Sequence, residues 1–254
     1  MQDIQVSIAD KIATVTLNRA PVNALTNKLY GELGDVFLQL SENRDVNCVI
    51  LQSACAKAFC AGKDLKEFLA ARVEDDPANA AIVRRTFSAI LNCAVPVIAA
   101  VNGPALGAGA VIASVCDIRI ASRAATFALP EINVGRCGGG AHLGRLIPQG
   151  ALRRMFFTGQ PIDAQEAYRI GLVDQLVEPD QLSDTVLKLA TTIASKSPLG
   201  LRIGKKALRE AENLPLEEGY AREQQYSTEL MATEDAREAV RAVVEKRQPV
   251  FVGR

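Results

Sequence analysis

The residues that could carry chemistry in this sequence are clusters of glycine, a small number of carboxylates and one histidine. His142 is the only histidine, which excludes a metal site built on several histidines. Sites made of carboxylates alone have no recognisable spacing here. A Ser-His-Asp triad would need His142, but no Gly-x-Ser-x-Gly turn occurs. What remains is chemistry that uses backbone dipoles and one or two carboxylates.

Two glycine clusters resemble nucleotide-binding loops but lack the required spacing. After Gly107-Ala108-Gly109, the position of the third dinucleotide-loop glycine holds Ile112, and after Gly138-Gly139-Gly140 it holds Leu143. A Gly-x-x-x-x-Gly-Lys-Ser/Thr phosphate loop is also absent. We therefore expect neither a bound nucleotide cofactor nor a metal ion.

The elements that must position these residues alternate between strand and helix. Leu25, Leu29 and Leu33 recur with the spacing of an amphipathic helix. Continuous apolar runs at 48–51 and 97–101 are typical of buried strands. The expected order is strands 4–8 and 12–17, helix 25–40, strand 48–51, helix 80–93, strand 97–101, a turn and helix within 103–114, and strand 118–120. This alternation predicts an α/β fold.

Beyond about residue 179 the pattern predicts helices only. They cover residues 182–195, 199–211, 216–231 and 234–245, and Pro198 and Pro215 mark two of the breaks. We therefore divide the chain into an α/β core, residues 1–195, and a C-terminal helical region, residues 196–254.

Composition limits the partners that the chain can have. Its 254 residues include 29 basic and 29 acidic side chains, and this zero net charge argues against nucleic acid as a partner. No run approaches the ~20 apolar residues of a membrane span, and the first residues lack the features of a secretion signal. The six cysteines form no Cys-x-x-Cys pair, so we expect reduced, mostly buried thiols. We expect a cytoplasmic protein with no membrane partner.

Four segments in order and spacing resemble the crotonase (enoyl-CoA hydratase/isomerase) family. They are Leu17-Asn18-Arg19, Phe59 to Glu67 (FCAGKDLKE), Val101 to Gly109 (VNGPALGAG) and Leu129 to Gly135 (LPEINVG). The segments at 157–159 and 167–173 and the ending at 246–251 extend the match over essentially the whole chain. Each segment is a weak signal alone, whereas the ordered set is highly specific.

The resemblance implies a spiral of ββα units with a C-terminal helical region used for trimerisation, as a homotrimer or a dimer of trimers. It implies acyl-CoA thioester substrates, in which coenzyme A is part of the substrate, and an enolate held in an oxyanion hole. The matching donors are the backbone N–H groups of Lys63 and Ala108. The positions that the resemblance places around the substrate are Ala61, Asp64, Leu65, Gly107, Val111 and Gly139.

The carboxylates favour one reaction within this family. Family hydratases hold the reacting water with two glutamates. Here the second matches Glu131, but the first matches Val111, which can neither bind water nor move a proton. One carboxylate still suffices for a 1,3-proton shift, so we favour a one-glutamate enoyl-CoA isomerase. Burial beside Val111, Ile132 and Val134 would raise the pKa of Glu131 as a proton carrier requires.

Two alternatives remain open. His142 stands where the family usually has glycine, and it could replace the lost glutamate, which would restore hydration or another lyase or hydrolase reaction. The loss of that glutamate also fits an acyl-CoA-binding protein without catalysis. The basic run of Arg202, Lys205, Lys206 and Arg209 could contact the phosphates of coenzyme A or form a solvated helix face.

Overall fold

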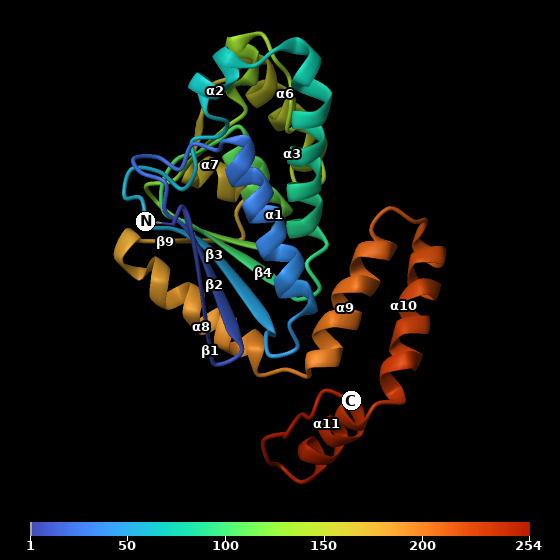
Figure 1. Ribbon diagram of the computed structural model, residues 1–254. Helices are drawn as coiled ribbons and strands as arrows, with labels where there is room; N and C mark the ends of the chain where they lie inside the picture. The colour runs from blue at the N-terminus through green and yellow to red at the C-terminus, as the bar shows by residue number, and fades with distance from the viewer. Residues whose placement is uncertain (1) are drawn as a thin grey trace.

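The computed structural model describes residues 2–254 and contains two sheets (Figure 1). The larger sheet has the strand order β1-β2-β3-β4-β6-β9. Its strands are β1 (Ile4–Ala9), β2 (Ile12–Leu17), β3 (Cys48–Ser53), β4 (Val97–Val101), β6 (Ile118–Ser122) and β9 (Gln175–Val177). The hairpin of β1 and β2 is antiparallel, and every later pair in this sheet is parallel. The smaller sheet joins β5 (Ala105–Leu106), β7 (Thr126–Ala128) and β8 (Ile162–Asp163).

The predicted helices are present, with ends that differ by a few residues. For example, α1 begins at Asn27 rather than at residue 25, because the Thr26 side chain accepts the Leu29 N–H and caps the helix. The helices are α1 (Asn27–Glu42), α2 (Leu65–Ala70), α3 (Asp76–Leu91), α4 (Ala108–Val115), α5 (Gly140–Leu143), α6 (Gln149–Thr158), α7 (Ala164–Arg169), α8 (Leu182–Ala194), α9 (Pro198–Ala211), α10 (Leu216–Met231) and α11 (Glu234–Val244). Short 3₁₀ turns are η1 (Val73–Asp75), η2 (Pro130–Val134) and η3 (Pro179–Gln181).

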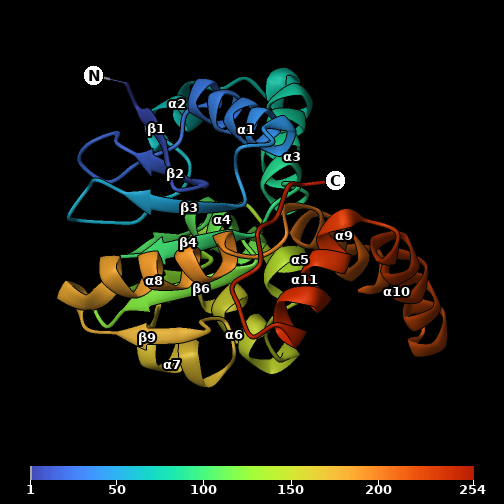
Figure 2. The ribbon, with the colours of Figure 1, turned by 90° about the horizontal axis from the view of Figure 1, so that it is seen from below.

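The two faces of the larger sheet are covered by different helices, as alternation along the strands requires. One face presents side chains such as Val15 and Val49 to α1, α3 and α4. The other presents Ile50, Ile98 and Ile120 to α8. Figure 2 shows α8 lying across this second face. Both faces of the parallel strands are therefore buried, which explains their continuous apolar sequences.

Parallel strands bring their carboxyl ends to one edge of the sheet, and this edge positions the candidate site. The segments that follow β3, β4 and β6 begin at residues 54, 102 and 123. They contain nearly all of three of the four segments identified above, those at 59–67, 101–109 and 129–135. Residues 63, 108 and 131, far apart in sequence, are consequently delivered to the same edge.

The C-terminal helices project from the core. In Figure 1, α9 and α10 lie side by side and extend away from the sheet. A three-residue gap, 195–197, separates α8 from α9, close to the predicted division of the chain. No helix within residues 2–254 is long and apolar enough to cross a membrane.

Neither interpretation of the basic run on α9 holds for its two buried members. Arg202 donates to the carbonyl oxygens of Ser41, in the last turn of α1, and of Val46, beyond the end of that helix. Lys205 lies 2.6 Å from the Asp117 carboxylate, and only 7% of its side chain is exposed. Both cations therefore attach α9 to the core, and neither forms a solvated face or a contact for coenzyme A.

Candidate active site

The structure brings together the two backbone N–H groups of Lys63 and Ala108. The chain around Cys60 runs beside residues 104–106, and the Leu106 N–H donates to the Cys60 carbonyl at 2.9 Å. A Cβ placed on Gly62 would lie 3.4 Å from the Ala108 nitrogen. Within residues 2–254, neither the Lys63 N–H nor the Ala108 N–H has a hydrogen-bond partner. Two free donors thus lie close together, one of them in the first turn of α4.

Glycines permit this close approach. Gly62 and Gly107 have φ values of +86° and +54°, a region that side chains disfavour. A Cβ on Gly109 would lie only 2.1 Å from the Cys60 carbonyl oxygen. The Gly107-Ala108-Gly109 cluster therefore lets two segments pack closely and also leaves the Ala108 N–H free to bind a ligand. Sequence reasoning missed Gly62 as a site residue, although a glycine directly before a backbone donor is a signal for it.

Hydrogen bonds on both sides hold the Lys63 peptide in place. The Leu25 N–H donates to the Gly62 carbonyl at 2.7 Å, and the Asp64 N–H donates to the Leu25 carbonyl at 2.9 Å. The Asp64 carboxylate accepts the N–H groups of Lys66 and Glu67 and pairs with Arg19 at 2.9 Å. The hydrogen bond from the Glu67 N–H is the largest effect that lowers the pKa of Asp64, and the Arg19 guanidinium lowers this pKa further.

Asp64 therefore supports the turn with its side chain, which is already engaged within the protein. The other two predicted substrate neighbours in this segment flank the donor. Ala61 donates its N–H to the Val22 carbonyl at 2.9 Å, and Leu65 opens α2 with 63% of its surface exposed.

Glu131 lies next to these donors. A Cβ on Gly107 would be 2.7 Å from Oε1 of Glu131, and one on Gly138 would be 3.9 Å from its Cγ. The pairing of β5 with β7 produces this arrangement, since the Gly107 N–H donates to the Ala128 carbonyl at 2.9 Å. Oε2 of Glu131 is buried and has no hydrogen-bond partner among the described residues. Burial raises the pKa of Glu131, partly opposed by its own backbone N–H.

The predicted surroundings of Glu131 were wrong in part. Ile132 and Val134 are 43% and 48% exposed, because the 3₁₀ turn η2 directs them outward. Val111 is buried as expected. A Cβ on Gly139, which has φ of +77°, would lie 3.0 Å from Cγ2 of Val111 and 2.6 Å from Cδ2 of Leu129. The position that matches the first family glutamate is thus an apolar, closely packed wall.

His142 lies on α5 and packs against an aromatic side chain. Its ring meets Phe87 of α3 edge to face, with centroids 5.4 Å apart. Burial lowers the pKa of His142, and the nearby Arg145 lowers it further. Within residues 2–254 no hydrogen bond joins this ring to Glu131 or to any other group. The His142 ring therefore packs against Phe87. This contact offers no group that could exchange a proton with the ring.

Cations and one aromatic ring gather near the donor segment. Nζ of Lys63 and Cζ of Arg136 each lie 5.6 Å from the centre of the Phe68 ring. Nη2 of Arg136 also donates to both carboxylate oxygens of Asp76, at 2.8 and 2.9 Å, which ties residue 136 to the start of α3. Cys137, the only exposed cysteine, follows directly.

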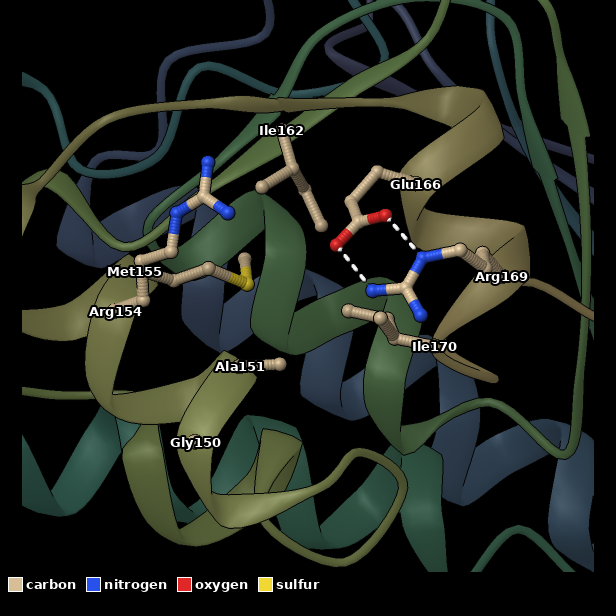
Figure 3. A pocket seen from close by; sticks show the side chains of 8 residues that line it. All are labelled: Gly150, Ala151, Arg154, Met155, Ile162, Glu166, Arg169 and Ile170. Carbon is tan, nitrogen blue, oxygen red and sulfur yellow. Dashed lines mark hydrogen bonds and ion pairs between the residues drawn. The ribbon is translucent and has the colours of Figure 1, made fainter.

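A separate cavity of about 240 Å³ lies between α6 and α7 and contains none of the predicted site residues (Figure 3). Its acid, Glu166, accepts two hydrogen bonds from Arg169, at 2.6 and 2.8 Å. The rest of its wall is mainly apolar, with Met155, Ile162 and Ile170. Within the described part of the chain, no three His, Cys, Asp or Glu side chains are grouped as metal ligands.

The sequence and the fold are similar to those of known proteins. The sequence model described as "Enoyl-CoA hydratase/isomerase" matches residues 7–254. The short-chain-enoyl-CoA hydratase of Clostridium acetobutylicum is 37% identical, covering 94% of this chain and 93% of that protein. The 2,3-dehydroadipyl-CoA hydratase of Escherichia coli is also 37% identical, over 100% of both. The crystal structure of an enoyl-CoA hydratase from Bacillus anthracis superposes with a TM-score of 0.96 at 35% identity, covering 100% of both chains.

Proposed function

Because the chain belongs to the enoyl-CoA hydratase/isomerase family, with the crotonase fold, we propose that it is a one-glutamate enoyl-CoA isomerase. The observation that carries the proposal is the pair of Glu131 and Val111. One carboxylate lies beside the two free N–H groups, and the position that matches the second carboxylate is a buried valine. A single base and an oxyanion hole are the minimum that a 1,3-proton shift requires.

The reaction proceeds through a dienolate. The Glu131 carboxylate removes a proton from C2 of a 3-enoyl-CoA, and the electron pair moves onto the thioester oxygen. The N–H groups of Lys63 and Ala108 stabilise that oxygen, each worth roughly 3 kcal/mol of barrier. The protonated Glu131 then returns the proton at C4, the C3–C4 double bond moves to C2–C3, and the thioester carbonyl re-forms.

The environment of Glu131 suits both steps. A carboxyl group with a raised pKa holds the proton more readily between the two transfers than an exposed carboxylate does. Its unpaired Oε2 is free to accept a proton without breaking an existing hydrogen bond. Because Val111 has no hydrogen-bonding group, no side chain at that position can hold a water molecule for attack on the substrate.

Hydration of a 2-enoyl-CoA is the second candidate, and the names of the relatives favour it. The similar proteins of Clostridium acetobutylicum and Escherichia coli are both named hydratases. In this candidate Glu131 holds the water, and His142 would supply the second proton-transfer group. The pKa of His142 lies below its usual value, so the ring is neutral at pH 7, when it can accept a proton or hold water.

Incubation with 2-enoyl- and 3-enoyl-CoA in D₂O, followed by mass spectrometry, separates these candidates. Isomerisation moves the double bond without adding water, and deuterium enters the product wherever the proton on Glu131 exchanges with the solvent before it is returned. Addition of one D₂O molecule to the 2-enoyl substrate would replace the proposal with hydration. Binding without any exchange or turnover would replace it with the acyl-CoA-binding function.

Two variants assign the activity to its base. Glu131→Gln removes the proton carrier, and we expect the rate to fall by about 10²–10⁴-fold. Glu178→Gln is the matched control, because Glu178 is an exposed carboxylate whose one ion pair within residues 2–254 is with Arg123. Equal rates for Glu131→Gln and wild type would remove Glu131 from either candidate reaction.

We also propose that the chain forms a homotrimer or a dimer of trimers through its C-terminal helices. Large apolar side chains along them are exposed, namely Leu216 (87%), Tyr220 (60%), Met231 (78%), Val240 (67%), Val243 (78%) and Val244 (76%). Of the residues in α10, only Gly219 is buried. Exposed apolar surface of this extent marks a protein interface. A monomeric mass by light scattering at micromolar concentration would contradict this.

A further inference from the structure

The Lys63 segment, residues 59–64, is held on both sides by backbone hydrogen bonds. On one side it pairs with residues 104–106, the segment that leads to Ala108. On the other side it runs parallel to residues 22–25. The position of the Lys63 N–H relative to the Ala108 N–H therefore depends on where residues 22–25 lie.

Asn23 lies in the middle of this supporting segment and is fully buried. Its backbone has φ of +53°, a left-handed conformation that asparagine adopts more readily than most other side chains. Before it in the sequence, the Val22 carbonyl accepts the Ala61 N–H at 2.9 Å. After it, the Leu25 N–H donates to the Gly62 carbonyl at 2.7 Å. A change in the conformation of Asn23 would therefore move both attachments of the Lys63 segment.

The side-chain amide of Asn23 is fully hydrogen-bonded. Nδ2 donates to Oγ of Ser53 at 2.8 Å and to the Phe59 carbonyl at 2.9 Å. Oδ1 accepts the Arg19 N–H at 2.8 Å and the Cys55 thiol at 3.3 Å. The amide thus uses both of its donor hydrogens and both lone pairs of its oxygen. It joins the last residue of β3, Ser53, to the first residue of the Lys63 segment.

We propose that Asn23 is a positioning residue for the oxyanion hole, whose amide holds the Lys63 N–H where it and the Ala108 N–H meet one thioester oxygen. This inference rests on the proposed function, because it takes these two groups as the donors. Asn23 is buried and does not touch the substrate, so it acts through the Phe59 carbonyl and the end of β3. A displacement of about 1 Å in a catalytic group can lower a rate about 100-fold.

Asn23→Gly tests the proposal, because glycine accepts a positive φ and the variant loses only the side chain. Asn47→Gly is the matched control. Asn47 is 1% exposed, and its Nδ2 donates to the Ala194 carbonyl at 2.9 Å, so this variant also loses a buried bond from an amide to a backbone carbonyl. Asn47 precedes β3 and Ser53 ends it, so the two amides lie at opposite ends of that strand. Both variants should unfold at lower urea concentrations than wild type.

The first readout is the ¹³C NMR signal of [1-¹³C]butyryl-CoA bound to each protein. This saturated thioester can neither isomerise nor add water, so the signal does not depend on turnover. Hydrogen bonds from an oxyanion hole polarise the thioester carbonyl and move its signal downfield from that of the free thioester. We expect Asn23→Gly to lose most of the downfield displacement that wild type produces, and Asn47→Gly to retain it.

The second readout is the division of the effect between kcat and KM, measured with the enoyl-CoA that wild type converts. The donors act most strongly in the transition state, so kcat of Asn23→Gly should fall about 100-fold while KM changes little. Asn47→Gly should keep both constants close to those of wild type. A purely structural role for Asn23 would lower the amount of folded protein and leave the carbonyl signal of the bound, folded protein unchanged.

The carbonyl signal separates failure of this inference from failure of the proposed function. Equal displacement in Asn23→Gly and wild type would overturn the positioning role and leave the oxyanion hole in place. No displacement in wild type would overturn the oxyanion hole, and the inference with it. Hydration in place of isomerisation would leave the comparison intact, because both reactions use the same donors. If Asn23→Gly does not fold, Ser53→Ala replaces it, since this variant removes one acceptor of Nδ2, and a wild-type displacement there would overturn the inference.

Discussion

Replacement of Glu131 by glutamine should lower the reaction rate by about 10²–10⁴-fold and stabilise the protein at the same time. In the wild type, an ionised carboxylate is partly buried, and Oε2 has no hydrogen-bond partner. An unsatisfied buried group of this kind costs about 1 kcal/mol or more of folding free energy. Glutamine has nearly the same shape but carries no charge, so it removes the cost of burying that charge. For a chain of this length, about 1 kcal/mol corresponds to a rise in Tm of roughly 2–4 °C.

The direction of the pH dependence follows from the raised pKa of Glu131. Well below the ordinary glutamate pKa, the carboxyl group is protonated in both the folded and the unfolded states, so wild type and Glu131→Gln should unfold alike. As the pH rises through the ordinary value, the unfolded state loses this proton first and the wild type loses stability relative to the variant. Above the raised folded-state pKa the difference is constant.

Urea denaturation of wild type and Glu131→Gln between pH 3.5 and 8, at one protein concentration, measures this difference, with turnover recorded on the same samples. Glu178→Gln, an exposed carboxylate paired with Arg123, should change stability by less than about 0.5 kcal/mol. A Glu131→Gln protein that is less stable than wild type at pH 8 would refute the reasoning. It would mean that the carboxylate is stabilised in the fold and is not a strained proton carrier.

Three further outcomes follow from the geometry. Gly109→Ala places a Cβ 2.1 Å from the Cys60 carbonyl oxygen. The segments that carry the Lys63 and Ala108 N–H groups must then move apart by about 1 Å, so steady-state kinetics should show kcat/KM reduced about 100-fold. Lys205→Met leaves the buried Val95 carbonyl without its donor and removes the ion pair with Asp117, so it should lower the free energy of unfolding by about 1–3 kcal/mol in urea. The adjacent exposed Lys206→Met should cost less than about 0.5 kcal/mol. A thiol reagent should modify only Cys137 in the native protein, because the other five cysteines are buried. Burial also raises the pKa of three of them, Cys48, Cys60 and Cys116, to about 12. After unfolding, the reagent should modify all six.

The long elements and the site motifs could be predicted from sequence because their signals are local. The apolar run at 97–101 and the leucine spacing at 25–40 correspond to a buried strand and to α1. Short elements such as α2 and β7 escaped prediction, since six residues or fewer span too little of a period. Their positions depend on partners distant in the chain, as in the pairing of β7 with β5 and β8.

By itself the sequence limited the chemistry that is possible at the proposed site, because residue type sets which groups can move a proton. Glu131 can do so, whereas the valine at 111 cannot, whatever the fold. The tertiary structure decided how deeply the functional and neighbouring side chains are buried and which groups they contact. Ile132 and Val134 turn outward from Glu131, and Arg202 and Lys205 are buried. Burial and hydrogen bonding are set by chain segments more than fifty residues apart, as between Lys205 and Asp117, and local sequence carries no record of which segments will meet.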